Sequence, residues 1–272
     1  MYTHECIDRM LIAENSLRLA AFGRLVVGPW LSICTPAFPA HRVSAVGAPD
    51  QGQRPHEPVV RLDPDAWVRL QSLLATVTQV LAQDLSDRRK ETPIQRRFRS
   101  AIYRFGDTFH QGYWDSVIVD LVIVMESLLT PNKQGGRMQL ALAASNLLGT
   151  TAAESKEIFD NVTLMYRLRN SSVHGEPLTQ EEWDKQILKI AQTAGSVHKS
   201  LDRGGREYAF EVMRDYARRT ICAMLHLDHA GRPPSSEVTH DIHRLHLDPT
   251  LRSDVQQAAK TYPLASRSSP PV

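Results

Sequence analysis

The chain has 272 residues, of which 42% are hydrophobic and 23% are charged. An apolar fraction of this size can bury a core that offsets chain entropy, so the composition excludes a protein that is disordered throughout. The three cysteines lie far apart and form no CxxC pair, which excludes a disulfide scaffold and fits a reducing cytoplasm. The formal net charge of +2 is too small to identify a nucleic-acid-binding protein.

Arginine makes up most of the basic residues, with 25 arginines against 7 lysines. Its planar guanidinium group is the better bidentate partner for phosphate and carboxylate groups. An arginine-rich coding bias explains the excess more readily than phosphate binding does. The arginine count alone therefore assigns no function.

No segment is typical of a membrane span or an export signal. The longest apolar stretch, residues 117–129, has 13 residues and contains Asp120 and Glu126, so it is too short and too charged to cross a bilayer. The first residues include acids and lack a basic start followed by an apolar run. We expect a cytoplasmic protein that has no membrane partner.

Residues 1–60 are predicted to form a separate N-terminal region of uncertain fold. The spacing of their apolar residues indicates a helix over 5–21, and short extended pieces follow between Gly and Pro residues. Residues 47–58 have the composition of a linker, because Gly and Pro are frequent there and no periodicity is present.

Residues 61–230 have the pattern of a helical domain, because apolar residues recur every three or four positions and period-two alternation is nearly absent. The expected helices cover 63–83, 94–110, 115–129, 137–149, 151–172, 179–194 and 206–227. Short loops between helices of this kind predict an all-α bundle. Residues 231–272 are polar and rich in Pro and Ser, so we expect a flexible C-terminal tail.

Two of the expected helices begin with a capping box. Thr151 is followed by Glu154, and Thr179 is followed by Glu182. At this spacing the Thr hydroxyl accepts a hydrogen bond from the backbone of the third helical residue, whose carboxylate reaches back to the cap. The two pairs therefore predict where these helices start.

The segment from Tyr166 to Glu176, with the sequence YRLRNSSVHGE, carries the strongest chemical signal in the chain. It contains Arg169, Asn170 and His174 where a helix is expected to end. Arginine supplies a permanent cation for a phosphate, and histidine has the side chain suited to moving protons near neutral pH. Together they are the minimum set for cutting RNA without a metal.

An arginine followed by a histidine a few residues later is a weak pattern by itself. Composition predicts about three such pairs by chance, and the sequence has four: Arg104/His110, Arg167/His174, Arg169/His174 and Arg219/His226. Position distinguishes them, because the first and last pairs lie in apolar helices. The pair Arg169/His174 spans a helix end and has a polar neighbour and Gly175 behind it.

The stretch from about 63 to 227 resembles the HEPN superfamily, and in particular the ApeA-type HEPN domains. One matching segment is an Arg-Phe helix followed by a pattern of the form D-L-x-I-x-x-E-x-L-L, at Arg104, Phe105, Asp120, Leu121, Ile123, Glu126, Leu128 and Leu129. The helix LALAASNLLG follows, and then the ending Tyr-x-x-Arg-polar-x-x-x-His-Gly. The resemblance covers roughly 165 residues and implies a HEPN-type helical bundle.

The resemblance also implies an activity. Catalytic HEPN domains are metal-independent endoribonucleases, mostly homodimers, in which Arg and His from two facing copies line one cleft. Carried over by position, Arg169 and His174 would be the catalytic pair and Asn170 a polar helper, with no cofactor and no metal. The 2′-hydroxyl of RNA would attack the adjacent phosphate, with His174 as general base or acid and Arg169 stabilising the charged transition state.

The geometry of an ideal helix restricts how this pair could act. Five residues correspond to a rotation of about 500°, which leaves Arg169 and His174 about 140° apart. A break near Ser171 and Ser172, or a second protomer that completes the site, would bring the two side chains together. The alternative interpretation is that both residues are cationic caps at a helix C-terminus.

Three further groups of residues are candidates for parts of a site. Asp120 and Glu126 are predicted to point in different directions, and either one supports an arginine such as Arg169 or forms an ordinary buried ion pair. The basic residues that could contact RNA are Arg167 and two members of the basic run Arg88, Arg89, Lys90, Arg96, Arg97 and Arg99, namely Arg96 and Arg97. The histidines near the C-terminus have no cysteine nearby and Pro-rich flanks, so we do not expect a metal site there; they are His226, His229, His240, His243 and His246. A solvated surface explains the basic run equally well.

Two functions are therefore expected from the sequence. The first is an endoribonuclease that acts in phage defence or as a toxin, with RNA as substrate and a regulatory or antitoxin protein as a partner. The second is a non-catalytic helical module that binds RNA or a protein. Loops of the P-loop, dinucleotide-binding, nucleophile-elbow and zinc-protease types are not found in the sequence.

Overall fold

The computed structural model describes residues 3–20, 64–82, 92–109, 111, 113–130, 136–175, 178–193, 206–229 and 248–261. Every regular element in these ranges is an α-helix, which confirms the predicted all-α fold. The helices are α1 (Thr3–Ala20), α2 (Pro64–Ala82), α3 (Pro93–Asp107), α4 (Trp114–Leu129), α5 (Arg137–Leu148), α6 (Ala152–His174), α7 (Gln180–Thr193), α8 (Arg206–His229) and α10 (Pro249–Thr261).

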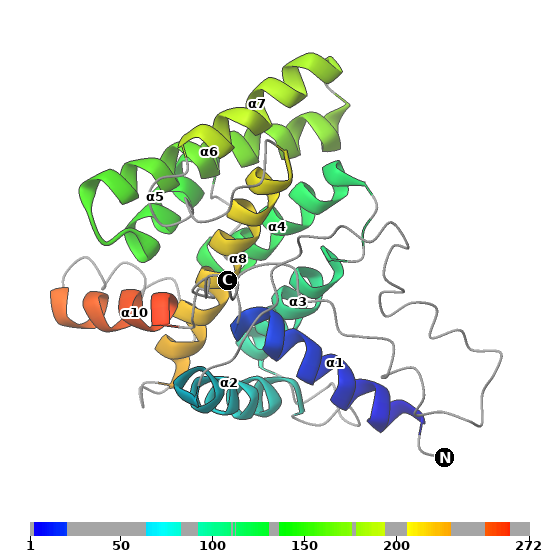
Figure 1. Ribbon diagram of the computed structural model, residues 1–272, viewed down its shortest axis with the longest axis vertical. Coiled ribbons are helices and arrows are strands. Elements are labelled where there is room, and N and C mark those ends of the chain that lie inside the picture. Colours follow the sequence, from blue (N-terminus) through cyan, green and yellow to red (C-terminus); the bar gives the residue numbers. More distant parts are fainter. Residues whose placement is uncertain are drawn as a thin grey trace, which may run out of the picture.

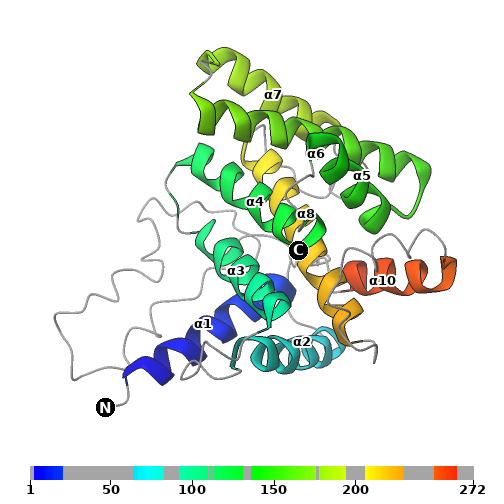
Figure 2. The ribbon, with the colours of Figure 1, turned by 180° about the vertical axis from the view of Figure 1, so that it is seen from behind.

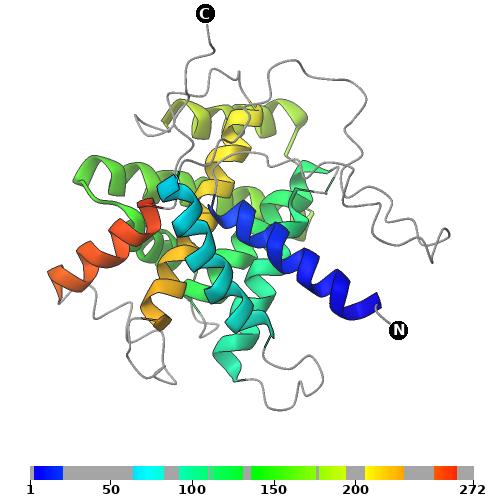
Figure 3. The same cartoon turned by 60° about the horizontal axis from the view of Figure 1, so that its bottom comes forward.

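Helix α8 runs through the middle of the bundle, as Figures 1 and 2 show from opposite sides. It packs against α1, α3, α4, α5, α6, α7 and α10. Every side chain from 208 to 225 is buried as a result. Helices α5, α6 and α7 lie together at the top of the view in Figure 1, away from α1 and α2. Figure 3 shows α1 and α2 beside each other.

Local signals in the sequence place several helix starts. Thr179 and Glu182 form the expected capping box, because the Glu182 N–H donates to the Thr179 hydroxyl at 3.2 Å and the Thr179 N–H donates to the Glu182 carboxylate at 2.9 Å. Thr151 accepts from the Glu154 N–H at 3.1 Å, but the Glu154 carboxylate reaches Thr150 at 2.9 Å. These contacts satisfy backbone N–H groups that a helix start leaves without intrahelical partners.

Three buried arginines of α8 bind the C-terminal ends of other helices. Each guanidinium group donates a hydrogen bond to a backbone carbonyl at or just beyond the last turn of α1, α3 or α5. The contacts are Arg218 to Leu19 at 3.2 Å, Arg214 to Thr108 at 2.8 Å and Arg219 to Leu148 at 2.5 Å. The last carbonyls of a helix have no intrahelical partner and carry partial negative charge, so buried cations stabilise them.

Each of these three arginines also has a carboxylate partner. Asp215 is 2.7 Å from Arg218, Glu211 is 2.8 Å from Arg214, and Glu154 is 3.0 Å from Arg219. A buried charge is tolerated when it is paired and hydrogen-bonded in this way. Part of the arginine excess is therefore used inside the core to join helices.

The N-terminal region differs from the prediction. We expected residues 1–60 to be separate from the helical domain, but α1 packs against α2, α3 and α8. Leu19 is completely buried, and Arg18 donates to the Gly106 carbonyl at 2.6 Å. Residues 3–20 therefore belong to the same core as the rest of the bundle. The linker expected at 47–58 and the extended pieces before it lie outside the described residues.

The C-terminal tail also differs in part. Residues 249–261, which we expected to be flexible, form α10 against α8 and α5. Leu251 and Val255 are buried, and the Gln256 amide donates to the carbonyls of Asn146 and Gly149 at 3.2 and 2.7 Å. Because this sequence is polar overall, its few apolar positions were too weak a signal to predict a packed helix.

None of the described helices has both the length and the apolar character that crossing a bilayer requires. This agrees with the interpretation of residues 117–129, which lie entirely within α4, a helix that packs against α3, α5, α6 and α8.

The buried thiol of Cys222 should make the fold sensitive to alkaline pH. Burial raises the pKa of Cys222 to about 12, whereas the thiol of an unfolded chain ionises near its ordinary value of 9. Between these two values the unfolded chain loses a proton that the folded chain keeps, so the free energy of unfolding should fall by up to about 1.4 kcal/mol per pH unit. Urea unfolding of the wild type and of Cys222→Ala at pH 8, 9 and 10 measures this. An equally steep fall in both proteins would assign it to other groups, such as Tyr216, whose pKa burial also raises.

Candidate functional site

Helix α6 carries the candidate residues and is continuous from Ala152 to His174. It ends at Gly175, whose φ of 66° lies in the left-handed region that glycine adopts without steric cost. The break considered near Ser171 and Ser172 is absent. Within one chain, the directions of Arg169 and His174 therefore differ by about 140°, as on any regular helix.

Arg169 lies between α6 and α4 and contacts three side chains. Its Nη1 donates to the Asn170 carboxamide oxygen at 3.0 Å, and its Nη2 is 3.8 Å from the Glu126 carboxylate. Its guanidinium carbon lies 5.7 Å from the centre of the Tyr166 ring, within the range of a cation–π interaction. The side chain is 22% exposed, so a ligand can reach part of it.

Tyr166 and Glu126 are coupled to this arginine. Burial, the negative charge of Glu126 and a hydrogen bond to Glu126 raise the pKa of the Tyr166 hydroxyl, and the positive charge of Arg169 partly offsets them. The hydroxyl therefore keeps its proton at neutral pH and donates to Glu126. No role was expected for Tyr166 from the sequence, although its spacing of three from Arg169 on a helix predicts contact between the two side chains.

His174 occupies the last turn of α6 and is exposed. Within the described part of the chain, it has no hydrogen-bond or ion-pair partner. The preceding residue, Val173, is an apolar side chain that is 50% exposed. The imidazole is thus available to a ligand or to another protein chain, and it points in a different direction from Arg169 of the same chain.

Asp120 does not contact Arg169. It forms an ion pair with Arg104 at 2.6 Å and accepts a hydrogen bond from Gln111 at 2.5 Å. Asp120 and Glu126 thus have different partners, as their spacing on a helix predicts, and of the two only Glu126 contacts Arg169. Of the Arg104/His110 pair, Arg104 is engaged by Asp120, and His110 lies outside the described residues.

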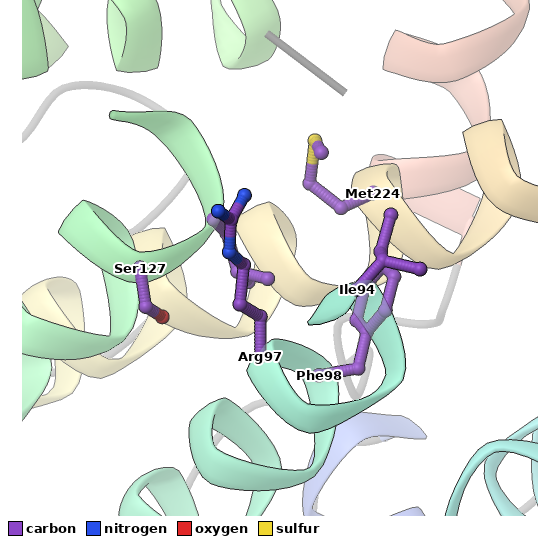
Figure 4. Close-up of a pocket in the computed structure, with 6 residues that line it drawn as sticks. Ile94, Arg97, Phe98, Ser127 and Met224 are labelled. Atoms are coloured by element: carbon purple, nitrogen blue, oxygen red, sulfur yellow. The ribbon is translucent and has the colours of Figure 1, made fainter. Parts of the chain in front are cut away.

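The three expected RNA-binding residues lie on two helices, Arg167 on α6 and both Arg96 and Arg97 on α3. Arg167 is exposed beside Glu182, whose pKa is lowered by hydrogen bonds from Thr179 and by the charge of Arg167. Arg96 is exposed on α3. Arg97 lines a hollow between α3, α4 and α8 with Ser127 and Met224, as Figure 4 shows.

This hollow is too small for a nucleotide. Its enclosed space is about 10 Å³, which is no more than one water molecule needs. Its other lining residues are apolar: Ile94, Phe98 and Leu128. The candidate site is therefore the partly exposed group of Arg169, Asn170, Glu126 and Tyr166, and not this cavity.

The C-terminal histidines give no metal site in the part of the chain that the structure describes, where no cluster of three or more ligating side chains occurs. His240, His243 and His246 lie outside the described residues. In the Arg219/His226 pair, Arg219 is buried and donates hydrogen bonds to the Leu148 carbonyl and the Glu154 carboxylate.

Compared with known proteins, the chain matches no family model, and no curated protein or solved structure is significantly similar to it.

Proposed function

We propose that the chain is a HEPN-type metal-independent endoribonuclease in which Arg169 and His174 act on RNA. The observation that supports this is the state of Arg169, whose guanidinium group is held in place by Asn170, Tyr166 and Glu126 while part of it stays exposed. A preorganised cation of this kind stabilises charge that develops on a phosphate. The resemblance of residues 63–227 to HEPN domains supplies the reaction.

The proposed reaction begins when the 2′-hydroxyl of RNA attacks the neighbouring phosphorus atom. His174 takes the hydroxyl proton as general base, and the bond from phosphorus to the 5′-oxygen breaks. A proton returned to that oxygen leaves a 5′-hydroxyl end and a 2′,3′-cyclic phosphate. Arg169 binds the phosphate oxygens while the negative charge on them increases.

The proposal needs two copies of the chain. Because α6 is unbroken, Arg169 and His174 of one chain point in different directions, which favours a site that a second protomer completes. A two-fold axis near the end of α6 would place His174 of one copy opposite Arg169 of the other. The exposed Val173 lies beside His174, where such a contact would bury it.

Cleavage of a labelled single-stranded RNA in the presence of EDTA tests the proposal. We expect the wild type to cut the RNA, and we expect Arg169→Ala and His174→Ala to lose about 10²-fold or more of the rate, because each removes a group that acts in the transition state. A DNA strand of the same sequence should stay intact, since it lacks the 2′-hydroxyl. Equal rates for all three proteins would remove both residues from the mechanism.

A second function is supported by the same contacts. The pairing of Arg169 with Glu126 and the place of His174 in the last turn of α6 would also suit a structural pair in a helical module that binds RNA or a protein. Such a protein would bind RNA without cutting it. Expression that harms the host, and is harmless with His174→Ala, distinguishes the nuclease from the binding module.

The biological setting belongs to the proposal as well. A ribonuclease of this type would act in the cytoplasm, in defence against phage or as a toxin, and an antitoxin or another regulatory protein would control it. These assignments follow from the family resemblance.

A further inference from the structure

The Glu126 carboxylate is placed between two groups that compete for it. The Arg169 Nη2 is 3.8 Å away, which is too long for a hydrogen bond, so this is an ion pair with only loose geometry. The Tyr166 hydroxyl donates a hydrogen bond to the same carboxylate. Both ion-pair partners are about one-fifth exposed, with 22% for Arg169 and 23% for Glu126.

The donors of Arg169 are incompletely used. A guanidinium group has five N–H bonds. Nη1 uses one for Asn170, Nη2 makes only the 3.8 Å ion pair with Glu126, and the buried Nε is not accessible to a ligand. Glu126 is the only carboxylate of the described part of the chain that forms an ion pair with Arg169. The guanidinium group can therefore still form the bidentate contact that phosphate prefers.

A phosphate bound to Arg169 would repel the Glu126 carboxylate from its present position beside the same guanidinium group. Both are anions that would lie against the same guanidinium group, and like charges at this separation repel strongly where water is partly excluded. We propose that Glu126 is the resting counter-ion of Arg169 and that a phosphodiester group of RNA displaces it. This inference rests on the proposed function, because it assumes that RNA phosphate binds at Arg169.

Tyr166 makes this exchange feasible. When the phosphate takes Arg169, the Glu126 carboxylate keeps the hydrogen bond from the Tyr166 hydroxyl, so no anion is left without a partner in a partly buried place. The Tyr166 ring stays beneath the guanidinium group and keeps it in position. Tyr166 is thus a positioning residue that acts through Glu126 and Arg169.

The test is the binding of a 2′-deoxy-substituted, uncleavable oligonucleotide, measured by fluorescence anisotropy at fixed pH and ionic strength. We expect Glu126→Gln to bind about fivefold or more tightly than the wild type, because the competing charge is gone. Asp115→Asn is the matched control: it removes one negative charge from the same helix at an exposed position. We expect it to change the affinity much less. Tyr166→Phe should weaken binding, since Glu126 then depends on Arg169 alone.

The outcomes separate this inference from the proposed function. If Arg169→Ala weakens binding and Glu126→Gln does not strengthen it beyond Asp115→Asn, the counter-ion role is wrong while phosphate binding by Arg169 stands. If Arg169→Ala has no effect, phosphate does not bind at Arg169, and both proposals fail. The double variant Glu126→Gln with Arg169→Ala should show none of the gain. Circular dichroism spectra and melting temperatures check that each variant is folded.

Discussion

Replacing Arg218 with alanine should lower the free energy of unfolding by about 3–5 kcal/mol. Arg218 and Asp215 are the most deeply buried ion pair among the described residues, with side chains 2% and 0% exposed and atoms 2.7 Å apart. Without the guanidinium group, the completely buried Asp215 carboxylate loses this ion pair while its charge stays in the core. The Leu19 carbonyl at the end of α1 also loses the Arg218 donor and keeps the weak one from the Cys222 thiol at 3.7 Å.

Urea unfolding followed by circular dichroism at pH 7 measures this loss. The control is Lys156→Ala, because Lys156 and Asp160 form an exposed pair on α6, with side chains 77% and 44% exposed. We expect that change to cost less than about 1 kcal/mol. If Arg218→Ala does not fold, the double variant Arg218→Met with Asp215→Leu is measured instead. It removes both charges from the core, so we expect it to be more stable than Arg218→Ala. Similar losses for Arg218→Ala and Lys156→Ala would contradict the assigned role.

Mixing two inactive variants should restore ribonuclease activity. In the proposed dimer, Arg169 of one copy works with His174 of the other, so a dimer of Arg169→Ala with His174→Ala keeps one intact site. With free exchange between protomers at equal concentrations, half of the dimers are mixed. In each mixed dimer, one of the two sites is intact and the other has lost both residues. The expected activity is roughly a quarter of the wild type, against a loss of about 10²-fold or more for each variant alone.

The control is to mix Arg169→Ala with the double variant Arg169→Ala/His174→Ala, a combination that has no intact site in any dimer. Size-exclusion chromatography with light scattering confirms that exchange takes place. Activity that stays at the level of the single variants in exchanging dimers would exclude a site shared between copies, and the unbroken α6 would then leave Arg169 and His174 without a common phosphate.

The sequence predicted those features of the fold that depend on neighbours along the chain. Apolar spacing located eight of the described helices, all except α10, and the Thr179–Glu182 pair marked the start of α7. The partner of Arg218 at the end of α1 depends on a contact across 199 residues, which no local pattern contains. For the same reason α1 and α10 were not expected to belong to the core.

In the candidate site too, the sequence predicted the positions of residues along the chain but not their partners on other helices. Arg169, Asn170 and His174 lie near the end of α6, where the sequence placed them. The sequence left open whether Glu126 or Asp120 supports an arginine at the site, because a helix position gives a direction and not a partner. The structure pairs Glu126 with Arg169 and Asp120 with Arg104.

The contacts of α8 have a consequence for the order of folding during synthesis. The arginines of α8 donate hydrogen bonds to carbonyls that lie far earlier in the chain: 106 residues earlier for Thr108, 71 for Leu148 and 199 for Leu19. The first helices therefore leave the ribosome long before the residues that complete their C-terminal ends have been made, and topologies rich in such distant contacts form slowly. The nascent chain stays exposed to chaperones and proteases until α8 has emerged, and the bundle then closes around it late and cooperatively.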